Sequence, residues 1–148
     1  MAFSLLCQWN GGCMGCCGNN YPSVKLVARA ISDNTREFSS CDSASENDLL
    51  RFRDRALATN LRYGVCRNLI VREGKMLCPL HPLLNKGKDL RIGHCDVDYF
   101  CETALVFAQW NDLKKKNFLE FIDLKKLNNI SYSLKMVEGE LLNEFERG

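Results

Sequence analysis

The segment "CQWNGGCMGCC", residues 7–17, places four cysteines within eleven positions. Glycines stand between and around these thiols, and glycine lets a backbone turn tightly through positive φ values. Such a segment can be a disulfide knot, a redox-active thiol pair or a set of metal ligands. The rest of the sequence has to decide among these three interpretations.

The bulk properties favour one globular domain in a reducing compartment. A chain of 148 residues, 46% hydrophobic and 26% charged, suits a single compact core. The formal net charge of +2 gives no basic field that would favour nucleic acid. No run approaches the ~20 apolar residues that span a bilayer, and "MAFSLLC" lacks the basic start of a secretory signal. We therefore expect a cytoplasmic protein, with no nucleic-acid or membrane partner, whose thiols stay reduced.

Cysteine number and spacing weigh against two of the three interpretations. The chain has nine cysteines, so full pairing would leave one over. The pair Cys13-x-x-Cys16 has the spacing of a thioredoxin-type redox motif. That motif belongs at a helix start after a strand, and nothing before Cys13 resembles such a strand. Metal ligation is the interpretation that the sequence favours.

The remaining sequence predicts a mainly α fold with a small β-hairpin. A Cys/Gly-rich loop covers residues 1–21, and apolar residues then recur at helical spacing through residues 22–64. Within residues 65–101, two apolar runs flank "REGK", which predicts a hairpin turning at Glu73–Gly74. Residues 102–148 are again helical in pattern.

This last region shows three boundary signals. Asp98 is suited to begin a helix, and "NDLKKKNF" interrupts or bends that helix near its middle. Asn128–Asn129 marks a break. Ser131 or Ser133 then caps a final amphipathic helix that ends near Arg147.

A second group of metal-ligand residue types lies in the middle of the chain. Cys66 and Cys78 fall on opposite arms of the expected hairpin, and His81 follows Cys78 after two residues. The other histidine, His94, directly precedes Cys95. Zinc takes tetrahedral cysteine and histidine sets of this kind, and thiolates also hold iron–sulfur clusters.

The order Cys13-x-x-Cys16-Cys17, then "CRNL" at Cys66, "GKMLCPLHP" at Cys78 and a later Cys95 resembles the YkgJ-like CxxCxxCC cysteine-cluster family. Proteins of that family are described as having a zinc- or iron-chelating domain, with no settled reaction. The resemblance covers roughly residues 7–101. It departs from the family pattern in two places, because five residues separate Cys7 from Cys13 and His81-Pro82 stands where the family tends to have Arg-Pro. The resemblance implies metal binding by six cysteines: Cys13, Cys16, Cys17, Cys66, Cys78 and Cys95.

Three further residues join these as candidate metal ligands: Cys7, Cys101 and His81. Cys41, in a Ser/Asp-rich loop, is interpreted as an incidental thiol, while His94 is open between solvent exposure and coordination. Our hypothesis is a single compact domain in which the opening loop folds onto the hairpin and encloses one or two centres of zinc or iron, including a [4Fe–4S] cluster. Two alternatives stay open. One is an iron–sulfur redox or transferase-type enzyme, and the other is a zinc-stabilised interaction module whose C-terminal helix docks a protein partner.

Overall fold

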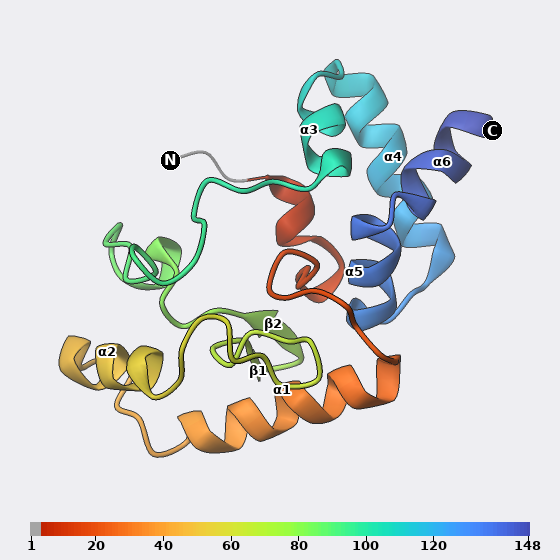
Figure 1. Ribbon diagram of the computed structural model, residues 1–148. Helices are drawn as coiled ribbons and strands as arrows, with labels where there is room; N and C mark the ends of the chain where they lie inside the picture. The colour runs from red at the N-terminus through yellow and green to blue at the C-terminus, as the bar shows by residue number, and fades with distance from the viewer. Residues whose placement is uncertain (1–3) are drawn as a thin grey trace. The chain divides into compact units, whose positions relative to one another are not determined.

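The computed structural model describes residues 4–148. This part of the chain divides into two compact units. The terminal unit combines the chain up to Cys16 with Asp98–Gly148, and the central unit is Cys17–Val97. Within residues 4–148 there are six α-helices and one two-stranded antiparallel sheet, which confirms the expected mainly α fold with a small β-hairpin (Figure 1).

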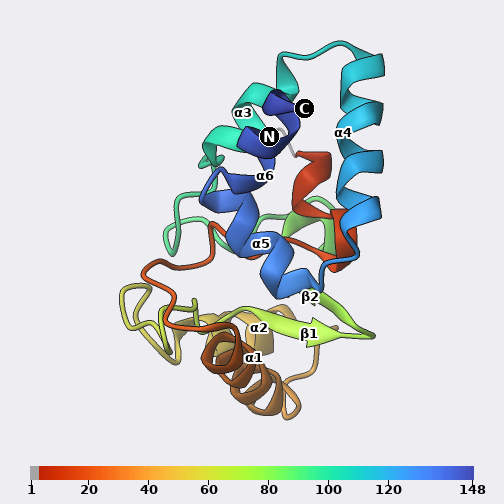
Figure 2. The ribbon, with the colours of Figure 1, turned by 90° about the vertical axis from the view of Figure 1, so that its right-hand side faces the viewer.

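The central unit is built on α1 (Val24–Phe38). The helix begins where the Ser23 side chain accepts a hydrogen bond from the Leu26 N–H, an N-cap that directly follows Pro22. Strands β1 (Ile70–Arg72) and β2 (Lys75–Leu77) pair antiparallel, and β1 lies against this helix (Figure 2). Helix α2 (Glu46–Asp54) completes the unit, together with the 3-10 helix η3 (Pro82–Leu84).

The hairpin turns where the sequence predicted. Glu73 and Gly74 both have positive φ, at 53° and 77°, as a two-residue turn that matches the twist of the strands requires. At the other end of the hairpin, Ile70 is buried in the core of this unit, where the Phe38 and Phe52 rings meet edge to face at 4.9 Å. The buried apolar residues of this core are Phe38, Leu49, Phe52, Ile70, Leu80 and Leu90.

The terminal unit begins with two 3-10 helices, η1 (Leu5–Cys7) and η2 (Trp9–Gly11). Four helices follow after the central unit: α3 (Glu102–Ala108), α4 (Asp112–Lys125), α5 (Asn129–Val137) and α6 (Glu140–Arg147). Their buried faces enclose Leu6 from the opening segment, so both ends of the chain contribute to one core. Its buried residues are Leu6, Phe107, Phe118, Ile122, Tyr132, Met136 and Leu141.

Helix boundaries in the terminal unit differ from the sequence prediction. The helix expected from Asp98 begins at Glu102, with Cys101 at its N-cap. Of the two expectations for "NDLKKKNF", interruption is the one confirmed: a new helix starts after Asn111, whose side chain accepts a hydrogen bond from the Lys114 N–H at 2.9 Å.

The expected final helix is two helices. It starts at Asn129 rather than after Ser131 or Ser133, because the Asn128 side chain provides the cap by accepting from the Ser131 N–H at 2.8 Å. Gly139, with φ at 78°, then ends α5 and begins α6, since glycine adopts the left-handed conformation at little cost. None of the helices in the described part of the chain has the length and apolar character needed to cross a bilayer.

Candidate metal-binding cysteines

All nine cysteines are free thiols, and they are shared between the two units. Cys16 ends the first part of the terminal unit and the adjacent Cys17 begins the central unit. The terminal unit holds Cys7, Cys13, Cys16 and Cys101. The central unit holds Cys17, Cys41, Cys66, Cys78 and Cys95.

The opening segment of the terminal unit curls so that its thiols come close together. The Cys13 N–H donates to the Cys7 carbonyl at 2.8 Å, which closes the loop between these two residues. Cys7 is an exposed residue, yet desolvation of its sulfur raises the pKa of the thiol to about 12. The neighbouring sulfurs of Cys13, Cys16 and Cys101 raise this pKa further, because like charges placed together repel.

Backbone N–H groups point at two sulfurs of this group. Burial raises the pKa of Cys13 to about 11, and a hydrogen bond from the Gly15 N–H, at 3.4 Å, opposes that shift by favouring the thiolate. Burial also raises the pKa of Cys101, while N–H groups of Ala104 and Thr103 at the start of α3 donate to its sulfur and lower it. Charge-assisted hydrogen bonds of this kind are stronger than neutral ones and favour an ionised sulfur.

Side chains of α5 hold the opening segment in place. The buried Tyr132 hydroxyl donates to the Leu6 carbonyl at 2.6 Å, one residue before Cys7. The buried Ser133 hydroxyl accepts from the Met14 N–H at 2.9 Å and donates to the Asn129 carbonyl at 2.7 Å. These contacts fix the backbone on both sides of the Cys7–Cys13 loop, and Figures 1 and 2 show the opening turns beside α5.

In the central unit, Cys17 lies opposite Cys66. The Cys66 N–H donates to the Cys17 carbonyl at 2.7 Å, next to the antiparallel bridge between Gly18 and Val65. A Cβ atom on Gly18 would come within 1.9 Å of the Gly64 carbonyl oxygen, so only glycine permits this close approach. Directly opposite residues of an antiparallel pair project their side chains to the same face.

Cys78 lies where β2 ends, beside two other thiols. Burial raises the pKa of Cys78 to about 12, and the sulfurs of Cys66 and Cys95 raise it further. A hydrogen bond from the Leu80 N–H and the positive charge of Arg91 oppose this rise. The same Arg91 guanidinium is held by Asp89 at 2.8 Å, so a fixed cation stands beside the thiols.

The two histidines use ring nitrogens for other hydrogen bonds. His81 Nδ1 accepts from the Leu83 N–H at 3.1 Å and caps η3. A neutral imidazole that binds metal through Nε2 carries its proton on Nδ1, so coordination would cost His81 this bond. His94 Nε2 lies 3.1 Å from Asn68 Nδ2. The amide is oriented by Arg55, which donates to Asn68 Oδ1 at 3.0 Å, so His94 Nε2 is the acceptor in this contact.

Cys41 lies apart from both thiol groups. Burial raises its pKa, and so do the carboxylates of Asp48 and Asp42, whereas no other cysteine acts on it. Its interpretation as an incidental thiol stays a prediction.

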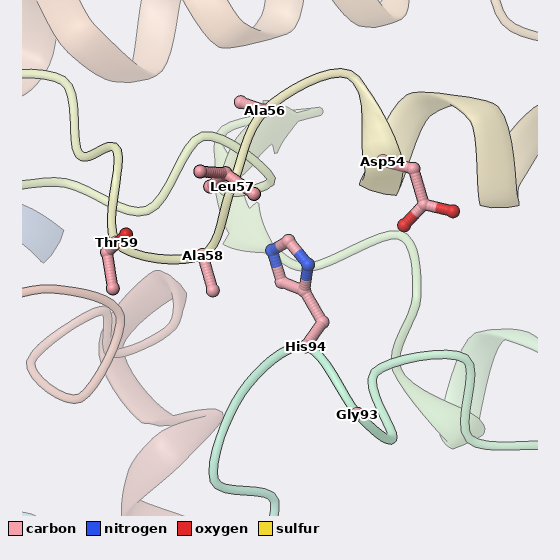
Figure 3. Close-up of a pocket in the computed structure, with 7 residues that line it drawn as sticks. All are labelled: Asp54, Ala56, Leu57, Ala58, Thr59, Gly93 and His94. Carbon is pink, nitrogen blue, oxygen red and sulfur yellow. The ribbon is translucent and has the colours of Figure 1, made fainter.

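An open pocket in the central unit contains His94 but no free acid–base pair. Figure 3 shows the imidazole pointing toward the segment from Ala56 to Thr59, with Asp54 to one side. Arg53 binds the Asp54 carboxylate at 2.7 Å, and Asn68 occupies His94 Nε2. Both titratable groups are therefore engaged in structural contacts.

The sequence did not identify the residues whose side chains support the thiols. Arg91, Ser133 and Tyr132 were not singled out, because no local motif distinguishes a residue that acts across the fold. Arg91 offered a weak signal, as it stands four residues before Cys95.

Thiol groups are close together, but they are not arranged as a coordination shell. Among residues 4–148, no group of three or more Cys, His, Asp or Glu side chains is positioned to hold a metal ion. Preformed sites are rare without the metal, because coordination and local folding occur together. In comparisons with protein-family models, curated proteins and solved structures, nothing matched this chain.

Proposed function

We propose that this chain is a metal-binding cysteine-cluster protein whose thiols bind zinc or iron. The observation that carries the proposal is the proximity of partly desolvated thiols within each unit. Burial raises the pKa of Cys7, Cys13 and Cys78, and neighbouring sulfurs raise each of these pKa values further. The resemblance to cysteine-cluster proteins points in the same direction.

Binding of a soft cation would offset the repulsion among thiols placed this close together. Several thiols placed together repel one another when they ionise, and an uncompensated cluster of thiolates in a desolvated place is costly. A metal ion reverses this cost, since a coordinating thiol is deprotonated outright by the local positive charge. Zinc and iron both accept thiolate ligands, and thiols in a reducing compartment stay free to bind them.

The alternative roles make different demands on the chain. An iron–sulfur enzyme would need a cluster with inorganic sulfide, whereas an interaction module needs only zinc and a free face. The apolar side of α6 is already covered, because Leu141 is fully buried and the Phe145 ring packs 5.0 Å from that of Phe118. Docking of a protein partner through the C-terminal helix is therefore proposed only for its polar face.

Metal and sulfide analysis tests the proposal. The full chain is purified without oxygen and without chelators, and its zinc, iron and acid-labile sulfide are measured. We expect at least one equivalent of zinc or iron per chain, with a colourless zinc protein or a brown, sulfide-containing iron protein as the two supporting results. The Cys41→Ser variant is the matched control and keeps the full metal content. Protein that stays free of metal after anaerobic addition of zinc or iron with sulfide would contradict the proposal.

A further inference from the structure

We propose that Cys17 and Cys66 form a reversible cross-strand disulfide when the chain meets a small oxidising molecule, which makes this pair an oxidative modification site. The inference goes beyond the proposed function and does not depend on metal binding. Both residues belong to the central unit, and both are thiols that are partly exposed to solvent. An oxidant of low molecular weight can therefore reach them.

The pairing of two backbone segments sets Cys17 opposite Cys66. Gly18 and Val65 form an antiparallel bridge, so the residue before Gly18 lies across from the residue after Val65. A hydrogen bond from the Cys66 N–H to the Cys17 carbonyl, at 2.7 Å, agrees with this register. Side chains of opposite residues project to the same face of an antiparallel pair. Both side chains therefore leave the backbone on one side.

The spacing of such a pair suits a disulfide. Opposite residues joined by ladder hydrogen bonds have Cα atoms about 5.5 Å apart, and disulfides most often join Cα atoms about 5.5–6 Å apart. Their Cβ atoms lie about 4.5–5.5 Å apart, whereas a disulfide holds Cβ atoms at about 3.5–4.5 Å. The two segments therefore have to draw together by about 1 Å. A bond formed under such strain is more easily reduced, so the modification is reversible.

A glycine requirement keeps the two segments close together. A Cβ atom on Gly18 would stand 1.9 Å from the Gly64 carbonyl oxygen and 3.1 Å from the Val65 Cα. Asn34 also fixes the second segment, because its side-chain amide donates to the Cys66 carbonyl at 2.9 Å. The backbones of both cysteines are thus held in register before any bond forms between their sulfurs.

The register selects this pair over other cysteines of the central unit. Among residues 4–148, no other strand pairing or bridge places two cysteines opposite each other. The hairpin pairs Ile70 with Leu77, so the same register extended by one residue sets Leu69 across from Cys78. Strand pairing therefore favours a bond from Cys66 to the opening of the unit rather than to the hairpin.

A low-molecular-weight disulfide, such as oxidised glutathione, is the class of oxidant that this step needs. The thiolate of one cysteine attacks a sulfur of the oxidant, breaks its S–S bond and releases one small thiolate. The thiolate of the other cysteine then attacks the mixed disulfide and releases the second small thiolate. The two protein thiols give up two electrons to the oxidant, and their two protons pass to the released thiolates. Excess small thiol reverses both steps.

Disulfide mapping of the purified full chain tests the proposal. The chain is incubated with oxidised glutathione, the remaining thiols are alkylated, and a tryptic digest is analysed by mass spectrometry without reduction. Trypsin cleaves after lysine and arginine, so Cys66 falls in peptide 63–67 and Cys17 falls in peptide 1–25. We expect a cross-link between these two peptides to be the main product that contains Cys66. Excess reduced glutathione should remove it.

Neighbouring variants identify which cysteine of peptide 1–25 takes part, since this peptide also contains Cys7, Cys13 and Cys16. Cys17→Ser should lose the cross-link to peptide 63–67, whereas Cys16→Ser, the matched control, should keep it at the wild-type yield. In denaturing urea the yield of the wild-type cross-link should fall several-fold, because the register that places the two residues opposite each other is lost.

Several results would overturn the proposal. One is Cys66 left without a cross-link, either alkylated or with glutathione attached. Another is a main cross-link from peptide 63–67 to Cys78 or Cys95. A cross-link that Cys17→Ser keeps, or that forms equally well in urea, would also overturn it. The outcome is separate from the metal analysis, because a chain that binds no metal can form this disulfide and a chain without the disulfide can bind metal.

Discussion

The two units present their thiols on very different supports. In the terminal unit the opening turns rest on four helices that enclose an aromatic cluster, in which Trp110, Phe118 and Phe145 lie with ring centroids 5.0–5.5 Å apart. In the central unit the thiols sit at a short strand pairing, at a hairpin of two three-residue strands and in two loops around α1. The same residue type therefore lies beside a helical core in one unit and beside a hairpin and loops in the other.

The two units therefore differ in the interactions that stabilise them. Aromatic side chains bury large apolar areas, and pairs in edge-to-face contact contribute beyond that area. The terminal unit therefore has a source of stability that does not depend on metal. Between Asp54 and Val97 the central unit has only six strand residues and one 3-10 helix, so much of its backbone has no regular ladder to stabilise it. Coordination energy would supply part of that stability.

The largest expected effect is that of metal removal on the stability of the central unit. Structural zinc contributes on the order of 10 kcal/mol in small domains that fold only with the metal. We expect a chelator to expose the amides of residues 66–80 to rapid hydrogen exchange while the amides of α4 (Asp112–Lys125) stay protected. Hydrogen exchange followed by mass spectrometry measures both segments in one sample.

The control for this experiment is readdition of zinc, which should restore protection of residues 66–80. Equal loss of protection in both segments would show that the units do not differ in their dependence on metal. Unchanged protection in both segments would show that neither depends on metal.

The next largest effects are expected at two residues, one in each unit, whose side chains hold the backbone near the thiols. Asn34 is fully buried, donates to the Cys66 and Leu69 carbonyls at 2.9 Å each, and accepts from Arg62 at 3.0 Å. Asn34→Leu removes the three hydrogen bonds of this buried side chain and should lower the free energy of unfolding of the central unit by about 2–4 kcal/mol, although the Cys66 carbonyl still accepts from the Leu69 N–H and Arg62 still binds Glu37. The shift in the urea midpoint, followed by circular dichroism, measures this loss.

The matched substitution in the terminal unit is Ser133→Ala. It removes the acceptor of the Met14 N–H, and we expect the free energy of unfolding of the terminal unit to fall by about 1–2 kcal/mol, measured in the same way. Equal losses for Asn34→Leu and Ser133→Ala would show that the two residues do not differ in what they contribute.

Periodicity and turn chemistry made much of the fold predictable. The α1 helix follows from the apolar spacing between Val24 and Phe38, and the hairpin from the turn at Glu73–Gly74. The helices after Asp98 were predicted less well, because caps decide between one bent helix and two separate ones. Asn111 and Asn128 act through side-chain hydrogen bonds that an apolar pattern does not reveal.

The sequence can nominate cysteines as candidate ligands, but it does not show which of them belong to the same unit. Spacing singles out Cys13, Cys16 and Cys17 as one motif, whereas the structure assigns the last of these to the other unit. Cys101 belongs to the same unit as Cys16 but follows it by 85 residues in the sequence, and no local sequence pattern links residues so far apart. Only the path of the backbone shows which thiols share a neighbourhood.

A smaller effect is expected at Tyr132, whose hydroxyl bonds to the Leu6 carbonyl. Tyr132→Phe keeps the ring in the core but leaves a buried carbonyl without its donor, at a cost of about 1–2 kcal/mol to the terminal unit. The shift in the urea midpoint, followed by tryptophan fluorescence, measures this cost. Tyr99→Phe is the control, because Tyr99 is half exposed, and it should leave the midpoint unchanged. Equal midpoints for Tyr132→Phe and the wild type would show that this bond does not hold the opening segment.

The smallest effect concerns the Glu37–Arg62 ion pair of the central unit. Burial raises the pKa of Glu37, but hydrogen bonds from Arg62, at 2.9 and 3.0 Å, and the charge of Arg55 outweigh it, so the net pKa lies below the ordinary 4.5. Stability from a lowered carboxyl pKa is fully present above the ordinary value and is lost as the pH falls through the lowered one. Since the pair is partly exposed, Glu37→Gln should cost only about 0.5–1 kcal/mol. This gap from the wild type should stay constant between about pH 5.5 and about pH 8, because Glu37 remains ionised throughout that range. Denaturant midpoints of the zinc-loaded proteins measure it, and a gap that changes across this range would mean that another titrating group, rather than the Glu37 carboxylate, sets the effect.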